Sequence, residues 1–464
     1  MKQISVVIAI MTMWLLSFLA MSAVGQNVGV PSRVSSMAYS STGLVNGVDA
    51  IGINPALITL PKGQRVSIAL LPFSLNAGTD FFSYETYQKY FTGVPGSVAE
   101  RDPYYMNTAE KTELLDMFNG RTGTIRASMS YTLAAVSVST PAGSFAIGIR
   151  DRIATNAVIP RSLAEFFLFG NTPGTTFDFS ETSISSSWTR DYSFTYAQRI
   201  QFSRKQAPAL SFGATIKYVE GYGYFGLDQF NSTFRTDPDS FVVSGRAQAH
   251  ALYAGTDWMA QSDIFKFQLF PTPAGSGYGI DLGVMAELST AFRVGLSFTD
   301  VGNINWNRNT REVTADEAIE VSDLGSYQQL DEITRRLNGK EHAISSFSTP
   351  LPTAITASAA YSFSRFLGVN RPMHLALSVR EGLNSAPGNS TIPHVGIGAE
   401  WEAVPSIPIR LGVAAGGGLS PMLAAGIGLK MDSFTLDIGT NSLDSYVSSN
   451  HAALSVAISG RLDF

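Results

Sequence analysis

The last eleven residues of the chain alternate between two kinds of side chain and end on an aromatic ring. A β-strand has a side-chain period of two, so this segment has one apolar face and one polar or small face. Chain ends usually fray, and a regular strand at this end therefore indicates that its partners lie in a larger sheet. The apolar positions are Leu454, Val456, Ile458, Leu462 and Phe464, with Gly460 as the single gap.

A terminal aromatic residue on an alternating strand resembles the closing strand of bacterial outer-membrane β-barrels, whose assembly machinery recognises this ending. The resemblance implies that Phe464 is an assembly signal and that the barrel-assembly machinery is a partner. The alternative for this segment alone is an edge strand of a soluble β-sandwich, because alternation indicates a strand and does not identify its solvent.

The first 25 residues resemble a secretory signal peptide. Lys2 precedes an apolar stretch from Ile4 to Ala23, and the small residue Gly25 follows, which predicts cleavage before Gln26. The alternative is a retained membrane anchor, because the stretch approaches the spanning length of about 20 residues. The sequence has no second apolar run of that length, which excludes a helical bundle of the inner membrane.

Composition favours a barrel and gives little support to other classes. Charged residues are 15% of the chain, against about 25% in soluble globular proteins, and there is no cysteine. The five histidines are scattered, and no spacing indicates a catalytic triad or a metal site. No basic cluster indicates nucleic acid. We therefore expect no enzyme activity, no cofactor and no bound metal.

Alternating segments of about the length of a tilted bilayer crossing, 9 to 11 residues, recur from residue 64 to residue 464. Asp281, Arg410 and Asp437 fall on the face opposite the apolar side chains. A basic residue that faces lipid at mid-depth costs about 2 to 4 kcal/mol, so this face should line the lumen. A count that includes 226–236 and 241–253 comes near sixteen, and about fourteen is equally consistent. We predict an all-β fold: a transmembrane antiparallel β-barrel of about 14 strands.

Residues 26–63 precede the first strand and consist of small residues and turn formers that end at Asn54-Pro55-Ala56. This pattern resembles the amino-terminal segment of FadL-type long-chain fatty-acid transporters and of PorV-like proteins, where it lies inside the barrel as a plug. The resemblance implies that Asn54, Pro55 and Ala56 anchor a plug and that Asp49 is a charge held inside the barrel. The alternative is an exposed leader with a β-turn.

A second resemblance lies in residues 277–306, which contain Gly277-Tyr-Gly-Ile-Asp281-Leu-Gly283 and end at Trp306. This pair of strands resembles a family of largely uncharacterised outer-membrane proteins from Bacteroidota, distantly related to the FadL and PorV types. Such membership implies a barrel more firmly than it implies a cargo.

Three insertions are expected, at 73–123, 155–190 and 303–350, with short helices in these long loops. In the first, Asn107 and Glu110 have the spacing of a capping box. In the second, Phe166, Phe167 and Phe169 belong to an apolar run that cannot occupy one helix face, so they should be buried in the lumen or dipped into lipid. These three residues are the predicted hydrophobic gate. In the third, a helix is expected around Leu330.

Two functions remain open. By resemblance to the FadL type, the chain would passively carry a hydrophobic, fatty-acid-like molecule across the outer membrane, with lipid around the barrel. By resemblance to PorV, it would instead dock or shuttle secreted proteins of the type IX system. An apolar tunnel in the lumen would favour transport, whereas a sealed lumen with broad apolar loop surfaces would favour docking.

Overall fold

Fourteen strands form one closed antiparallel ring in the computed structural model. The model describes residues 30–60, 63–81, 83–95, 101–102, 104–118, 120–202, 208–255, 271–322, 339–447 and 453–464. The first strand pairs with the last one, so the ring has no open edge. The predicted β-barrel of about 14 strands is confirmed. Its strands in ring order are β1 (Val66–Thr79), β4 (Thr122–Thr140), β5 (Gly143–Pro160), β7 (Ser183–Gln201), β8 (Ala209–Gln229), β11 (Gly275–Glu287), β12 (Phe292–Trp306), β16 (Ala354–Phe363), β17 (Met373–Gly382), β18 (His394–Val404), β19 (Ile407–Gly416), β20 (Leu419–Lys430), β21 (Phe434–Thr440) and β22 (Ala453–Asp463).

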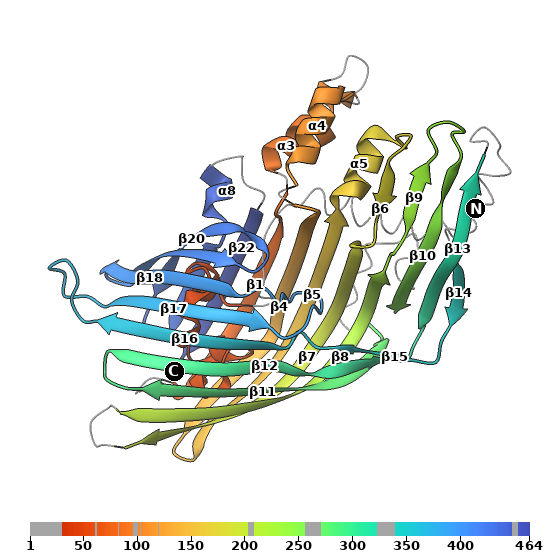
Figure 1. The fold of residues 1–464 in the computed structure, drawn as a ribbon. Coiled ribbons are helices and arrows are strands. Elements are labelled where there is room, and N and C mark those ends of the chain that lie inside the picture. The colour runs from red at the N-terminus through yellow and green to blue at the C-terminus, as the bar shows by residue number, and fades with distance from the viewer. Residues whose placement is uncertain are drawn as a thin grey trace.

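The sheet forks at β8, and the fork explains the two extra strands in the higher count. The first part of β8 pairs with β11, whereas its last part pairs with β10 (Val243–Ala254). β10 continues the sheet to β13 (Arg311–Val321) and β14 (Lys340–Ala343), which flare away from the ring in Figure 1. Residues 226–236 and 241–253 are therefore divided between the end of β8 and this extension.

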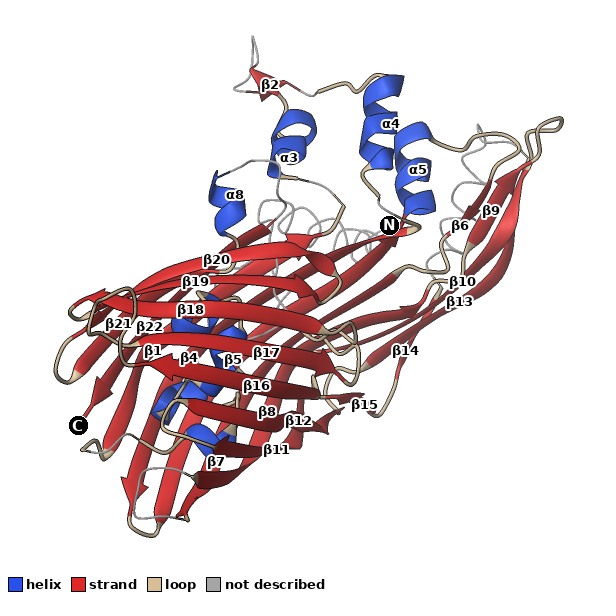
Figure 2. Ribbon diagram, turned by 60° about the vertical axis from the view of Figure 1, so that its left-hand side comes forward, coloured by secondary structure: helices blue, strands red, loops and turns tan. Residues whose placement is uncertain are grey.

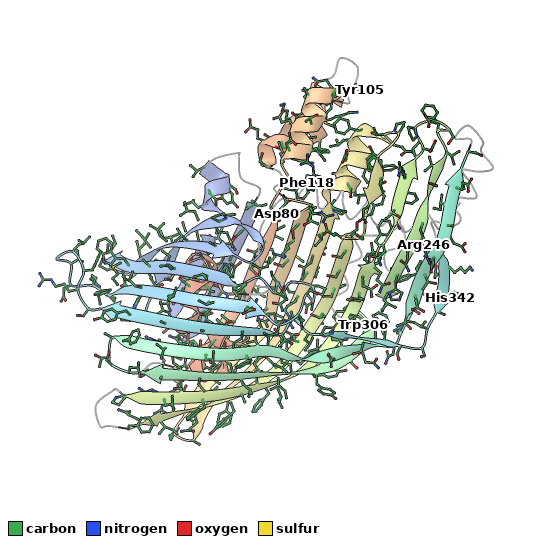
Figure 3. All side chains as sticks on the ribbon, viewed as in Figure 1. Asp80, Tyr105, Phe118, Arg246, Trp306 and His342 are labelled. Carbon is green, nitrogen blue, oxygen red and sulfur yellow. The ribbon has the colours of Figure 1, made fainter. Side chains whose placement is uncertain are left out.

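Trp306, the last residue of β12, belongs to one buried cluster with Val219 of β8 and Ala254 of β10. Its indole is fully buried, and its Nε1 donates a hydrogen bond to Thr349 Oγ1 at 2.8 Å. The indole packs against the aromatic rings of Tyr224 and Phe347. Gly221 leaves room for the indole, because a Cβ at that position would overlap it. Figure 3 shows Trp306 at the base of the extension.

The two ends of the ring differ in the length of their connections. At one end, which we call the turn end, β4 and β5 are joined by Pro141-Ala142 and β18 and β19 by Pro405-Ser406. At the other, the loop end, helices of the long connections stand above the ring in Figure 2. The loop-end elements are α3 (Tyr84–Phe91), β2 (Val94–Pro95), β3 (Arg101–Asp102), α4 (Thr108–Asp116), α5 (Arg161–Phe169), β6 (Thr176–Asp178), β9 (Thr233–Thr236), β15 (Phe347–Pro350) and α8 (Leu443–Val447).

The expected insertions contain more strand than the sequence suggested. β1 continues beyond Pro72 to Thr79, because the strand accommodates the proline in a bulge. β5 and β7 likewise extend into 155–190, and β13 to β15 occupy parts of 303–350. The capping box at the start of α4 is present, with Asn107 and Glu110 satisfying each other's backbone N–H groups. The helix expected around Leu330 lies outside the described residues.

The outer face of the ring is an apolar belt. On β19, Ile409, Leu411 and Val413 are 47%, 55% and 52% exposed, whereas Arg410 between them is 1% exposed and points inward. The same alternation recurs on β17 and β18. A continuous ring of exposed aliphatic side chains is compatible with lipid as the surrounding solvent.

The core of the molecule lies inside the ring. Residues 30–60, which we call the lumenal segment, form α2 (Ser32–Ser35) and three short 3₁₀ helices, η1 (Ser40–Gly43), η2 (Gly47–Ala50) and η3 (Pro55–Leu57). These helices contact opposite walls, with η1 against β17, η3 against β8 and α2 against β21, and they lie within the ring in Figure 2.

Candidate functional site in the lumen and the barrel wall

The Asn54-Pro55-Ala56 turn is fixed to the wall by its own side chain. Asn54 Oδ1 accepts the N–H of Ala56 at 3.0 Å, and Asn54 Nδ2 donates to the Val284 carbonyl at 3.2 Å. Pro55 occupies the first helical position, where no N–H is needed. Two wall glycines make this approach possible, because a Cβ at Gly213 would overlap the turn's backbone and one at Gly283 would overlap Asn54.

Asp49, predicted as a charge held inside the barrel, contacts the closing strand. Its Oδ2 lies 2.6 Å from Nη1 of Arg461, and Arg461 Nε also bonds Asp463 at 2.8 Å. The Asp49 and Arg461 side chains are mostly buried. The ion pair therefore holds η2 against β22 from inside the ring.

A second ion pair of the lumenal segment was not anticipated from the sequence. Arg33 binds both carboxylate oxygens of Glu400 on β18, at 2.8 and 2.7 Å. Glu400 also accepts from Arg410 at 2.6 Å. Arg33 belonged to the small-residue motif, but nothing local in the sequence indicates a partner more than three hundred residues away.

Charged side chains and the lumenal segment fill the interior. Lys217 Nζ lies 2.7 Å from Asp281 and 2.7 Å from Asp300, and Arg152 contacts Asp300 at 3.0 Å. Three interior cavities have volumes of about 40, 30 and 40 Å³. One water needs about 10 to 15 Å³, so each cavity holds a few waters and none holds a hydrocarbon chain.

The ladder between β1 and β4 is interrupted. It runs from Val66–Val138 to Ile68–Val136 and resumes at Phe73–Tyr131, so residues 69–72 and 132–135 have no place in its register. Leu71 has a φ of 43° and is 74% exposed, and Pro72 has no N–H to donate. We call this interruption the wall break.

An apolar hollow of about 620 Å³ lies on the outer side of the wall break. Ala69, Ala135 and Gly148 line both this hollow and the inner cavity of about 40 Å³ beside the lumenal segment. Ile149, Ser193 and Lys217 line both spaces as well. The larger side chains of the hollow are Ile68, Leu133, Val136, Ile147, Ile149, Tyr192, Phe194, Ile216, Lys217, Tyr218 and Tyr278.

The three phenylalanines proposed as a gate do not converge in the lumen. They lie on α5 at the loop end, outside the ring (Figure 2). Phe166 packs edge-on against Phe177 and Phe179, with ring centroids 5.4 and 5.8 Å apart. Phe167 is 78% exposed, and Phe169 is also exposed. Helical periodicity directs consecutive residues to different faces, so only Phe166 joins the aromatic cluster.

Phe464 completes the pairing of β22 with β1 through its backbone. Its N–H donates to the Val66 carbonyl at 2.9 Å, and its carbonyl accepts from the Val66 N–H at 3.1 Å. Its ring is exposed. The assembly role of this side chain stays a prediction.

A histidine bridges two carboxylates in the extension. His250 on β10 lies 2.6 Å from Asp228 and 2.9 Å from Glu312. Burial lowers the pKa of His250, but hydrogen bonds to Glu312 and Asp228 outweigh it, and the pKa is raised overall. Within the described residues, no group of three or more histidine, aspartate or glutamate side chains has the arrangement of a metal site.

A closed ring of fourteen strands, with an apolar outer belt and a filled polar lumen, defines a β-barrel of the outer-membrane type. Residues 55–441 match the model of DUF5723, a family of unknown function, and the chain belongs to that family. A search of curated protein sequences gave no match.

Solved structures with a similar fold include three proteins from Ralstonia and Pseudomonas. The Ralstonia pickettii toluene transporter TbuX is 12% identical, with 94% of this chain and 98% of that chain covered and a TM-score of 0.45. A Pseudomonas aeruginosa FadL homologue is 12% identical, with 95% and 99% covered and a TM-score of 0.41. The Pseudomonas putida toluene transporter TodX is 10% identical, with 95% and 99% covered and a TM-score of 0.39. The similarity to these structures is one of overall fold, and a FadL-type function and the Bacteroidota branch stay predictions.

Proposed function

We propose that the protein is a passive outer-membrane transporter of a small hydrophobic molecule, which crosses the barrel wall at the wall break. The observation that carries this proposal is the interrupted β1–β4 ladder, with an apolar hollow of about 620 Å³ on its outer side. The proposal rests on this wall and not on the likeness to toluene transporters.

The filled lumen makes a sideways route more favourable than an axial one. The ion pairs of Lys217 and Arg152 would have to separate before an apolar molecule could pass along the axis, and a separated charge in a buried site is costly. At the wall break the small side chains of Ala69 and Ala135 line both the outer hollow and the inner cavity, beside Ile149 and Lys217. No ATP-binding motif is present in the sequence, so a concentration gradient and apolar burial would drive the movement.

The wall break lies at a depth suited to delivery into lipid. Residues 69–72 follow Val66 by three to six positions, which places them about 10 to 20 Å along the strand at about 3.3 Å per residue. In barrels of this type the long loops face outside the cell, so the loop end would be extracellular. The signal peptide predicted at residues 1–25 fits export, and it lies outside the described residues.

The test is to fill the hollow from outside without touching the lumen. Ala134 is exposed and lines the hollow, so Ala134→Trp should reduce dye uptake into proteoliposomes several-fold for a hydrophobic fluorescent dye. Ala357→Trp is the matched control, because Ala357 is an exposed alanine on β16 that does not line the hollow. Equal uptake by wild type and both variants, each correctly assembled, would contradict the proposal.

Docking of secreted proteins is the second candidate, and the filled lumen favours it. Three cavities among the described residues of the interior are of water size, as expected for a docking protein. Large exposed apolar side chains occur at the loop end, including Tyr105, Phe167 and Phe241, but they come from separate loops. Native mass spectrometry in mild detergent separates the two candidates. A small apolar adduct that Ala134→Trp removes supports transport, whereas a stoichiometric protein partner with unchanged dye uptake supports docking.

A further inference from the structure

The connection between β17 and β18 folds into the ring at the loop end. We call residues 383–393 of this connection the mouth loop. Its tip, residues 386–390, is buried except for the half-buried Pro387, whereas Leu383 and Ile392 on its flanks are 55% and 49% exposed. The tip therefore lies inside the ring, and the flanks lie at the surface.

The tip reaches the opposite wall of the barrel. β5 and β18 lie on opposite sides of the fourteen-strand ring. Asn156 on β5 donates from its side-chain amide to the carbonyls of Ala386 and Asn389, at 3.2 and 3.0 Å. Its Oδ1 accepts the N–H of Gly388 at 3.3 Å. Both the donor and the acceptor end of the Asn156 side chain therefore hold the tip.

Two further asparagines fix the mouth loop to its own side of the ring. Asn389 Nδ2 donates to the Thr353 carbonyl at 2.8 Å, and Asn389 Oδ1 accepts from Arg380 Nη1 at 3.2 Å. Asn384 Nδ2 donates to the Leu351 carbonyl at 2.7 Å. Separation from Asn156 would therefore turn the tip towards the β17 side and would not unfold the whole loop.

The tip covers two of the interior cavities. Ala386 and Pro387 line the cavity of about 30 Å³. Gly388 lines one of about 40 Å³, together with Thr42 of the lumenal segment. Arg152 lines both cavities. Displacement of the tip would therefore connect both cavities, and the charged interior around Arg152, with the solution at the loop end.

The tip has little apolar surface to keep it in place. Its sequence is Ala-Pro-Gly-Asn-Ser, so it buries less apolar area than a loop with large aliphatic side chains. Its position depends mainly on hydrogen bonds, whose net contribution is modest because water replaces them when the tip moves out. Segments with few buried apolar contacts are the ones that open while the rest of a protein stays folded.

We propose that the mouth loop is a lid over the loop-end mouth of the lumen, with Asn156 as the residue that holds it closed. When the tip leaves Asn156, small polar solutes and ions enter the charged interior from the solution at the loop end. This access is separate from the wall break, because no residue of the mouth loop lines the apolar hollow. The lid therefore adds a polar route into the lumen to the sideways route of a hydrophobic molecule.

A single cysteine beneath the tip reports opening, because the chain has no cysteine of its own. Thr189→Cys is suitable, since Thr189 is 6% exposed, lines the cavity of about 30 Å³ and belongs to β7, a different strand from Asn156. The assembled full-length barrel in detergent is treated with a small charged methanethiosulfonate, and mass spectrometry follows the modified fraction.

Asn156→Ala in this background should raise the labelling rate about tenfold or more, because three hydrogen bonds that hold the lid closed are lost. Asn303→Ala is the matched control and should leave the rate unchanged. Asn303 is likewise a strand asparagine, but it is exposed on β12 and has no hydrogen bond to the mouth loop among the described residues.

Hydrogen exchange distinguishes a lid from a fixed cap. A lid predicts that residues 383–393 exchange faster than β17 and β18 in the unmodified chain, and that Asn156→Ala accelerates exchange in the mouth loop alone. The first part of this measurement needs no variant, so it decides the question even if Asn156→Ala fails to assemble.

Two results would overturn the proposal. One is equal labelling of Thr189→Cys with and without Asn156→Ala in assembled barrels. The other is exchange of residues 383–393 as slow as that of β17 and β18. Neither measurement depends on dye uptake, so failure of the lid and failure of the proposed function are distinguishable.

Discussion

Asp49 in the lumenal segment and Arg461 in the closing strand form an ion pair across 412 positions of the sequence, with Oδ2 and Nη1 2.6 Å apart. The pair joins the lumenal segment to the last strand of the ring. It ties the lumenal segment to closure of the barrel, because β22 also pairs with β1.

Replacement of Asp49 with asparagine should loosen the lumenal segment. The removal of one partner of a buried ion pair lowers the free energy of unfolding by about 3 to 5 kcal/mol. For Asp49→Asn we expect a loss of about 3 kcal/mol, because Asp463 still neutralises Arg461. We expect a lower unfolding midpoint and faster proteolysis of residues 30–60. Permeability to a hydrophobic dye should also rise if this segment acts as a plug. Unchanged dye uptake in a correctly assembled Asp49→Asn barrel would count against the plug.

Loss of the Asn54 cap should destabilise the barrel less than a side chain added to the wall at Gly283, where the turn packs. Asn54→Ala removes the cap of η3 and should cost about 1 to 2 kcal/mol in denaturant unfolding. Gly283→Ala places a Cβ against Asn54 and should destabilise the barrel more. Gly120→Ala is the matched control, because a Cβ there meets nothing. Equal stability of Gly283→Ala and Gly120→Ala would mean that the turn does not depend on this close contact.

Phe166 and Phe167 are adjacent but should respond differently to alanine. Phe166→Ala removes ring contacts with Phe177 and Phe179 and should destabilise the loop-end cluster by about 1 to 3 kcal/mol. Phe167→Ala removes an exposed ring and should stay within about 0.5 kcal/mol of wild type. Hydrogen exchange of β6 and β9 measures both effects. A gate function for Phe167 would appear as altered dye uptake without altered exchange.

The extension should become less stable as pH rises above the ordinary titration range of histidine. His250 has a raised pKa in the folded protein, so its contribution is fully present below the unfolded value of about 6.5 and is lost as pH rises through the folded value. Hydrogen exchange of β10 and β13 should therefore accelerate over that window. His250→Gln should remove the pH dependence of exchange. Slower exchange at higher pH, after correction for intrinsic rates, would contradict this assignment.

The sequence alone determined the class of fold and the direction of each strand face. Alternation at Ile409 to Val413 identified a strand with one apolar side, and the cost of a charge in lipid placed Arg410 inside, where the structure has it. The Asn54-Pro55-Ala56 motif likewise predicted its own local turn. These properties follow from neighbouring residues, because side-chain period and turn geometry are local.

Only the tertiary structure decided which partners these elements acquire. Residues 241–253 alternate like any barrel strand, yet they leave the ring because β8 is long enough to pair with β11 below and β10 above. The wall break and the Arg461–Asp49 pair each require residues that lie far apart in the sequence to meet. Alternation specifies that a strand exists and which face is apolar, whereas register and neighbours depend on how the whole ring closes.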